Sequence, residues 1–181
     1  MRLLLASDIH GRLKRAERFA SLVDRLSPDA IFLMGDYLYN GPRNGVPDDY
    51  DPLKVSEILN RYKDKIVGVR GNCDSRVDDL LLAFPLLDNR QLNYGGLEFD
   101  LFHGDEFSLK NLKPNPGAVI TSGHTHIYVL KKENGFIHLN PGSISFPKNG
   151  NPPTYALFDG KTFEIRCFDD DKLLASLSVS D

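Results

Sequence analysis

The chain has 181 residues, of which 41% are hydrophobic and 26% charged, and its formal net charge is -3 at pH 7. This length fits one domain over residues 1–181 with a sizeable core. The charge balance argues against strong nucleic-acid binding, and no apolar run approaches the roughly 20 residues that span a bilayer. Only two cysteines are present, and the N-terminal residues soon become too polar for a signal peptide. We therefore expect a cytoplasmic protein with no membrane partner.

The first half of the chain alternates between predicted strands and predicted helices. Buried strands are expected at residues 2–7, 30–34 and 66–69. A helix with one apolar face fills the first gap and ends at Ser27-Pro28, and another helix begins at Pro52. This β-α-β-α-β order predicts a parallel sheet with helices packed on it.

Polar side chains follow each of these predicted strands. Asp8 and His10 come after the first strand, Asp36 after the second and Asn72 after the third. The carboxyl ends of neighbouring parallel strands lie along one edge of an open sheet, and ligands bind in the crevice there. We therefore expect these side chains to converge in space.

The second half of the chain changes to short strand-like segments separated by turn signals. After a predicted helix at residues 77–84, strands are expected at residues 86–87, 97–102, 119–120, 127–131, 136–139, 155–158, 163–168 and 173–179. These segments predict a second, mostly antiparallel sheet packed against the first, with helices outside. Further polar clusters follow strands here, at His103-Gly104-Asp105 and Gly123-His124-Thr125-His126.

Histidines concentrate at the predicted strand ends. Four of the five histidines lie there, and only His138 lies within a strand. Alone, the His-x-His of the last cluster fits a solvent-facing strand better than a metal site. Together, the strand ends supply seven candidate metal ligands: Asp8, His10, Asp36, Asn72, His103, His124 and His126. Such a mixed set suits Mn²⁺, Fe²⁺, Zn²⁺ or Co²⁺, and it suffices for a pair of ions if one carboxylate bridges them.

A larger pattern emerges when these clusters are taken in order: Asp-x-His, Gly-Asp, Gly-Asn-x-Asp, His-Gly and Gly-His-x-His. In this order they resemble the motifs of the calcineurin-like binuclear metallophosphoesterases, across essentially the whole chain. The chain is especially similar to the small single-domain YfcE-like phosphodiesterases, which also carry the sequences found here at residues 41–44, 71–74 and 140–143. The resemblance implies an α/β fold of two facing mixed β-sheets (a β-sandwich) flanked by α-helices, in a four-layer αββα arrangement.

The resemblance also implies ligands and an activity. Asp8, His10 and His126 would hold one divalent ion, Asn72, His103 and His124 would hold another, and Asp36 would bridge both. The expected ions are two Mn²⁺, with Fe²⁺, Zn²⁺, Co²⁺ or Ni²⁺ as alternatives. A hydroxide between them would attack the phosphorus of a small phosphodiester, so the expected enzyme is a metal-dependent phosphodiesterase.

The chain departs from the family pattern at Cys73 and Asp105. Most of the superfamily has a histidine where Cys73 stands, and that histidine is thought to protonate the leaving group. A thiol, with an ordinary pKa of about 8.5, is a poor acid for an alkoxide. Cys73 therefore favours diesters with good leaving groups, or protonation from water or Asp74, and it fits equally well as a small buried side chain. Asp105 stands where close relatives often have histidine, which bears on substrate preference.

Three residues just beyond the metal motifs, Arg12, Asn40 and Arg43, could contact phosphate oxygens, although solvated loop positions are commoner for such residues. Other functions also fit the fold: a non-catalytic metal-binding scaffold like the retromer subunit, a nuclease or a phosphomonoesterase. The filled ligand positions argue against a scaffold, and the net charge of -3 argues against a nuclease. The loop that contains Tyr39 and Tyr50 could serve an interface between copies of the chain.

Overall fold

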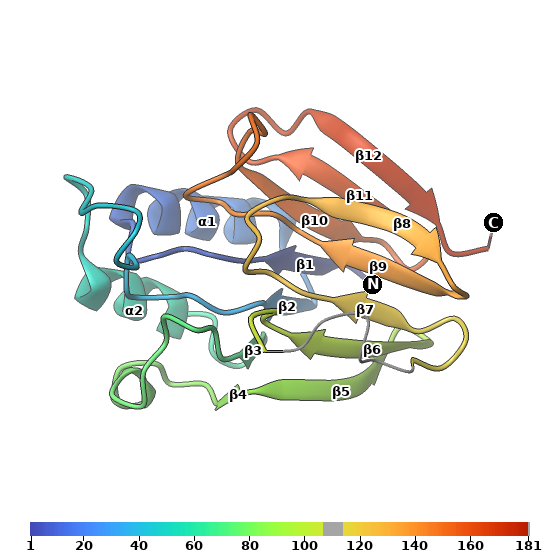
Figure 1. The fold of residues 1–181 in the computed structure, drawn as a ribbon, viewed down its shortest axis with the longest axis horizontal. Coiled ribbons are helices and arrows are strands. Elements are labelled where there is room, and N and C mark those ends of the chain that lie inside the picture. The colour runs from blue at the N-terminus through green and yellow to red at the C-terminus, as the bar shows by residue number, and fades with distance from the viewer. Residues whose placement is uncertain (107–113, 181) are drawn as a thin grey trace.

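The computed structural model describes residues 1–106 and 114–180, which form two mixed β-sheets that face each other (Figure 1). The seven-stranded sheet has the order β12-β11-β10-β1-β2-β3-β4, and the five-stranded sheet has the order β5-β6-β7-β9-β8. The larger sheet contains β1 (Leu3–Ala6), β2 (Ala30–Leu33), β3 (Ile66–Val69), β4 (Leu86–Leu87), β10 (Thr154–Phe158), β11 (Thr162–Cys167) and β12 (Leu173–Ser178). The smaller sheet contains β5 (Asn89–Tyr94), β6 (Leu97–Phe102), β7 (Val119–Thr121), β8 (Val129–Glu133) and β9 (Phe136–Asn140).

The predicted β-α-β-α-β order of the first half is confirmed. Strands β1, β2 and β3 are parallel neighbours, with α1 (Leu13–Leu26) and α2 (Pro52–Asn60) between them in sequence. Helix α1 ends where Ser27 adopts a left-handed backbone conformation (φ 45°) ahead of Pro28. Helix α2 begins at Pro52, and the side chain of Asp51 accepts a hydrogen bond from the backbone N–H of Lys54. Neither described helix has the length and apolarity needed to cross a membrane.

Strand alternation divides the core into two layers. Leu3 and Leu5 of β1 face the smaller sheet, whereas Leu4 points to the layer that holds the helices. Between the sheets, the rings of Phe158 and Phe163 stack with centroids 4.2 Å apart. Both layers are closed to solvent, so the strand ends are held rigidly.

The expected fold class is confirmed as two facing mixed sheets with helices. Both α1 and α2 pack on the outer face of the seven-stranded sheet. Within residues 1–106 and 114–180, no helix covers the outer face of the five-stranded sheet.

The expectation of a mostly antiparallel second sheet is wrong. Strand β7 is parallel to both β6 and β9, and only the outer pairs of this sheet are antiparallel. The last strands, β10 to β12, join the first sheet because β10 pairs with β1. Strand β5, an edge strand of alternating exposure, was not predicted, since its polar residues carry no strong strand signal.

The predicted helix at residues 77–84 is also wrong. The structure has a single 3₁₀ turn there, Asp78–Leu80. The Asp78 carboxylate accepts a hydrogen bond from the Ser75 N–H at 2.7 Å, which stabilises the turn locally. Leu80 is 83% exposed while Leu82 and Phe84 are buried, so the apolar residues do not share one helical face.

Candidate metal centre

The seven predicted ligands come from the ends of five strands and lie at one end of the sandwich. Asp8 and His10 follow β1, Asp36 follows β2, Asn72 follows β3, His103 follows β6, and His124 and His126 follow β7. Strands β1, β2 and β3 are parallel, as are β6 and β7, so their carboxyl ends present side chains at the same edge. Because the two sheets face each other, the ligands that follow strands of the larger sheet lie close to those that follow strands of the smaller sheet.

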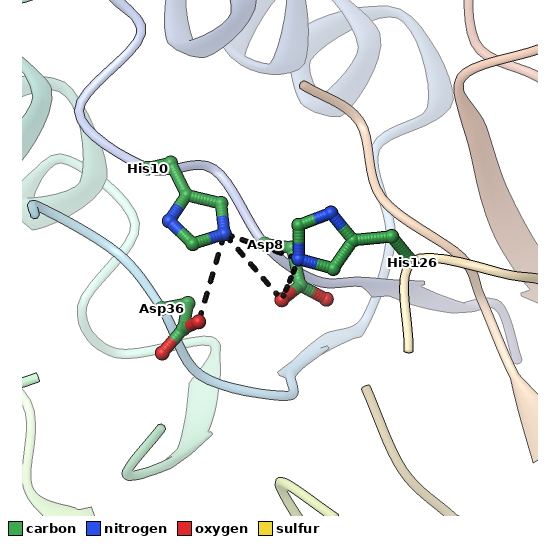
Figure 2. Close-up of side chains that lie close together, drawn as sticks. All are labelled: Asp8, His10, Asp36 and His126. Atoms are coloured by element: carbon green, nitrogen blue, oxygen red, sulfur yellow. Dashed lines mark hydrogen bonds and ion pairs between the residues drawn. The ribbon is translucent and has the colours of Figure 1, made fainter. Parts of the chain in front are cut away.

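One group contains Asp8, His10, Asp36 and His126, whose ligand atoms all lie within 4.8 Å of one another (Figure 2). The Nε2 atom of His126 is 3.2 Å from Oδ1 of Asp8, and the Nε2 atom of His10 is 3.6 Å from Oδ2 of Asp36. All four residues are buried. This geometry fits a divalent cation held by imidazole nitrogens and carboxylate oxygens.

Backbone carbonyls orient three of the histidine rings. The Nδ1–H groups of His10, His126 and His103 donate to the carbonyl oxygens of Tyr39 (2.9 Å), Phe146 (2.6 Å) and Met34 (2.5 Å), respectively. A carbonyl oxygen only accepts, so Nδ1 carries a proton in each ring and Nε2 is the nitrogen that faces the site. This is the usual arrangement for histidines that bind metals.

Asp8 provides the strongest sign that a cation belongs here. It is completely buried, and neither of its carboxylate oxygens has a hydrogen-bond partner among the described residues. The Nε2 atoms of His10 and His126 lie 3.3 Å apart, close enough for one cation to bind both. Burial would raise the pKa of Asp8 and lower that of His10, but the attraction between these neighbouring groups reverses both shifts.

The second group contains Asn72, His103 and His124. The amide oxygen of Asn72 lies 3.1 Å from Nε2 of His103 and 2.8 Å from Nδ1 of His124. Burial and His103 lower the pKa of His124, and the carboxylates of Asp8 and Asp105 only partly oppose this. His124 is therefore neutral at physiological pH and can offer a nitrogen lone pair to a metal.

Asp36 lies between the two groups. Its Oδ2 atom is 3.6 Å from Nε2 of His10 and 3.4 Å from Nε2 of His103. Burial would raise the pKa of Asp36, but the neighbouring His103 lowers it, so the carboxylate is charged. One oxygen of Asp36 thus faces both candidate ion positions.

The backbone at these positions is strained. Among the described residues, nine other than glycine have a positive φ, and five of them are candidate ligands: Asp8, His10, Asp36, His124 and His126. A left-handed residue directly after a strand turns the chain sharply, which directs its side chain across the strand end. Such strain is concentrated at functional sites, where the surrounding structure enforces it.

The Asn140-Pro141-Gly142-Ser143 segment holds the backbone of two turns that carry candidate ligands. The Asn140 amide donates to the carbonyl of Gly123 at 2.8 Å, and the Ser143 hydroxyl donates to the carbonyl of Asp8 at 2.9 Å. These two bonds link the turn after β1 to the turn after β7 through residues 140–143. Sequence analysis alone could not assign this role, because the bonds go to backbone atoms more than 15 residues away.

Cys73 and Asp74 lie beside the site with different surroundings. Burial and the charge of Asp36 raise the pKa of the Cys73 thiol to about 12, so it is not a thiolate at neutral pH. Burial and Asp36 also raise the pKa of Asp74 to about 7. The Asp74 carboxylate accepts hydrogen bonds from the backbone N–H groups of Asp36, Tyr37 and Gly71, which engages both of its oxygens.

The three candidate substrate contacts also differ. Arg12 pairs with Asp49 at 2.7 Å, and its guanidinium lies 5.5 Å from the ring centroid of Phe146. The buried amide of Asn40 donates to the carbonyls of Gly41 and Gly45 and so shapes its own loop. Arg43 is exposed and makes no ion pair with any described residue. Among the described residues, the guanidinium of Arg12 is therefore paired with a carboxylate, whereas that of Arg43 is not.

Comparisons with known proteins agree with this site. The sequence profile of the calcineurin-like phosphoesterase superfamily domain matches residues 1–162. The chain is 38% identical over 182 residues to phosphodiesterase YfcE of Escherichia coli (strain K12), which covers 99% of both chains. The solved structure of that phosphoesterase superimposes with a TM-score of 0.95 at 39% identity, over 99% of this chain and 100% of the other.

A more distant likeness concerns the fold alone. The structure of vacuolar protein sorting 29 from Cryptosporidium parvum matches with a TM-score of 0.65 at 18% identity, over 98% of this chain and 97% of that one. The same fold therefore recurs far outside the range of close sequence relationship. The extent of the profile match and the identity to YfcE show that the chain belongs to the calcineurin-like phosphoesterase superfamily, a family of metal-dependent phosphoesterases.

Proposed function

We propose that this protein is a metal-dependent phosphodiesterase that hydrolyses a small phosphodiester at a binuclear centre. The single observation that carries the proposal is the position of Asp36 Oδ2, which faces His10 at 3.6 Å and His103 at 3.4 Å. A carboxylate oxygen between two imidazole-bearing groups fits a bridge between two cations about 3.5–4 Å apart. The 38% identical relative in Escherichia coli is named a phosphodiesterase.

In this proposal each group holds one ion. Asp8, His10 and His126 would hold the first, Asn72, His103 and His124 would hold the second, and Asp36 would serve both. When bound, divalent ions supply Lewis-acid chemistry, lowering the pKa of water and neutralising charge on phosphate. Mn²⁺ is the proposed ion, and Fe²⁺, Zn²⁺, Co²⁺ and Ni²⁺ are alternatives that the same donors accept.

The chain's own residues prepare the site for this chemistry. The carbonyls of Tyr39, Phe146 and Met34 accept from Nδ1–H of the three rings, so Nε2 is the nitrogen that an ion would bind. The half-buried Phe146 ring lies edge-on to the His10 ring, with centroids 5.5 Å apart. Arg43, exposed and without a carboxylate partner, is the proposed contact for a phosphate oxygen.

The leaving group would take its proton from water. The Cys73 thiol has a pKa of about 12, too high for an efficient acid near neutral pH. The Asp74 carboxylate is engaged by three backbone N–H groups. The proposed substrates are therefore diesters whose alcohol leaves readily.

The test uses purified protein, Mn²⁺ and bis(p-nitrophenyl) phosphate. We expect turnover by the unchanged protein and only the buffer rate with Asp36→Asn or His124→Ala. His138→Gln is the matched control, since His138 lies within β9 and pairs with Glu133 rather than with the site. Unchanged turnover in both site variants would contradict the proposal. Metal binding without turnover of diesters, monoesters or cyclic nucleotides would instead favour a scaffold.

A further inference from the structure

Asp74 joins the turn that carries Asp36 to the turn that carries Asn72. Its Oδ2 atom accepts hydrogen bonds from the N–H groups of Asp36 and Gly71, each at 2.8 Å, and its Oδ1 atom accepts one from Tyr37 at 2.8 Å. The residue is only 8% exposed. Hydrogen bonds from backbone N–H groups to a buried carboxylate are among the stronger ones in proteins.

A second bond runs in the opposite direction. The Asp36 Oδ1 atom accepts the N–H of Cys73 at 2.9 Å, so each carboxylate holds the backbone of the other turn. This bond engages Oδ1 and leaves Oδ2 as the oxygen that faces His10 and His103. The paired bonds therefore decide which oxygen of Asp36 points into the site.

The two turns touch at Gly71. A Cβ atom at this position would lie 2.2 Å from Oδ1 of Asp36 and 2.5 Å from its backbone nitrogen. Any side chain at Gly71 would therefore push the turns apart. The contact of Gly71 with Asp36 and the hydrogen bonds of Asp74 therefore both determine the distance between the two turns.

We propose that Asp74 is a positioning residue that sets the spacing between Asp36 and Asn72, and thereby the affinity of the second ion position. The inference rests on the proposed binuclear function. Asp74 acts through the backbone of the two turns, since its carboxylate accepts hydrogen bonds from three N–H groups there.

The effect is larger at the second ion because of where the bonds of Asp74 end: Asp36 would serve both ions, but Asn72 would serve the second alone. These bonds reach the turns after β2 and β3, which carry Asp36 and Asn72. The remaining ligands of the first ion are held elsewhere: the Ser143 hydroxyl bonds the Asp8 carbonyl, and the Phe146 carbonyl bonds the His126 ring. Loosening the Asp74 bonds leaves those contacts in place.

The variant Asp74→Asn tests this spacing, because its amide presents N–H donors where the carboxylate accepts them. We expect the affinity for the second Mn²⁺ to fall by about 10–100-fold, the usual effect of losing a group that orients metal ligands. The affinity for the first ion should fall by a smaller factor, because Asp36 is the one of its proposed ligands that lies on a turn held by Asp74. Isothermal titration calorimetry gives both constants, and the spin-coupled electron paramagnetic resonance signal of a Mn²⁺ pair should appear only at raised Mn²⁺ concentrations.

Asp78→Asn is the matched control. Asp78 is 7% exposed and its carboxylate also accepts a backbone N–H, that of Ser75, but the bond stays within its own turn. This variant should bind both ions as the unchanged protein does. Gly71→Ala provides a second route, because its methyl group displaces the Asp36 turn sterically while Asp74 is intact.

The outcomes separate this inference from the proposed function. Unchanged affinity for the second ion in Asp74→Asn, or equal weakening of both ions, would overturn the positioning role. If circular dichroism shows that Asp74→Asn does not fold, Gly71→Ala decides, with the same expectation of a larger loss at the second ion than at the first. An unchanged protein that binds fewer than two ions would contradict the binuclear function itself.

Discussion

The thiol of Cys73 lies beside the candidate centre but remains protonated across the working range of most enzymes. Burial and the nearby Asp36 raise its pKa to about 12. The sulfur also lies 3.5 Å from the Asn72 side-chain nitrogen, which places it next to a candidate ligand. A group of this kind occupies space and contacts its neighbours without exchanging a proton near neutral pH.

We expect that Cys73→Ser leaves the pH dependence of kcat/KM unaltered between about pH 6 and 10, since neither side chain titrates in that interval. The rate itself should change by less than about tenfold. The measurement is a pH–rate profile with bis(p-nitrophenyl) phosphate and Mn²⁺ for both proteins. Loss or displacement of the alkaline limb in the variant would show that the thiol does transfer a proton.

For individual residues, the sequence indicated which residue types mark the site but said little about the role of each residue. Aspartate and histidine directly after apolar strands are unusual enough to mark a site. The role of Asp74 was inaccessible, because two of its three partners are backbone N–H groups of a turn 37 to 38 positions earlier in the chain. A sequence contains no signal for which backbone groups a carboxylate will meet.

Among the elements, the loop between β2 and α2 is attached to the start of α1 by an ion pair. The Arg12 guanidinium donates to Asp49 at 2.7 Å, and the N–H of Lys14 donates to the other oxygen of Asp49 at 3.2 Å. The same loop supplies the Tyr39 carbonyl that orients His10. The ion pair therefore supports the candidate site indirectly.

Asp49→Asn should reduce the free energy of unfolding at pH 7 by about 1 kcal/mol. Burial would raise the pKa of Asp49, but the bond to Arg12 lowers it below its ordinary value of 3.8. The folded state thus favours the charged form, so the contribution is complete above pH 3.8 and disappears as the pH falls through the lowered value. The difference between the two proteins should vanish in strong acid.

Urea unfolding at several pH values measures this difference. Asp48→Asn is the control, since Asp48 is exposed and forms no ion pair with the described residues. A pH-independent difference between Asp49→Asn and the unchanged protein would show that the pair contributes through packing rather than charge.

The elements also show where local patterns mislead. Residues 77–84 combine acids and apolar residues as a helix would, yet only Asp78–Leu80 forms a 3₁₀ turn, and Leu80 is exposed while Leu82 and Phe84 are buried. The pairing of β10 with β1 was likewise hidden, since the partners lie about 150 positions apart. Short-range periodicity predicts that a strand exists but does not select its neighbour.

At the scale of the whole molecule, the candidate centre joins the two sheets. Asp8, His10 and Asp36 follow strands of the larger sheet, whereas His103 and His126 follow strands of the smaller one. An ion bound by both sets would link the sheets at one end of the sandwich. It would bind only the folded state, because the unfolded chain does not preserve this arrangement.

Metal addition should therefore stabilise the protein. At a Mn²⁺ concentration of about 100 times the dissociation constant, one ion adds about 2.7 kcal/mol, which raises Tm by roughly 5–10 °C for a chain of this size. Differential scanning fluorimetry with added Mn²⁺ or EDTA measures the change. Asp8→Asn should lose the contribution of the first ion. A rise in Tm of equal size in that variant would contradict the assignment of Asp8.

The sequence by itself determined the alternation of strands and helices in the first half and the polar residues that end its strands. Both depend on local chemistry: apolar periodicity, the constrained backbone of Pro52 and the turn at Ser27. Tertiary structure alone decided that His126 lies 3.2 Å from Asp8 and that a single oxygen of Asp36 faces two histidines. These distances depend on two sheets packing face to face, and that packing is a property of the whole core rather than of any segment.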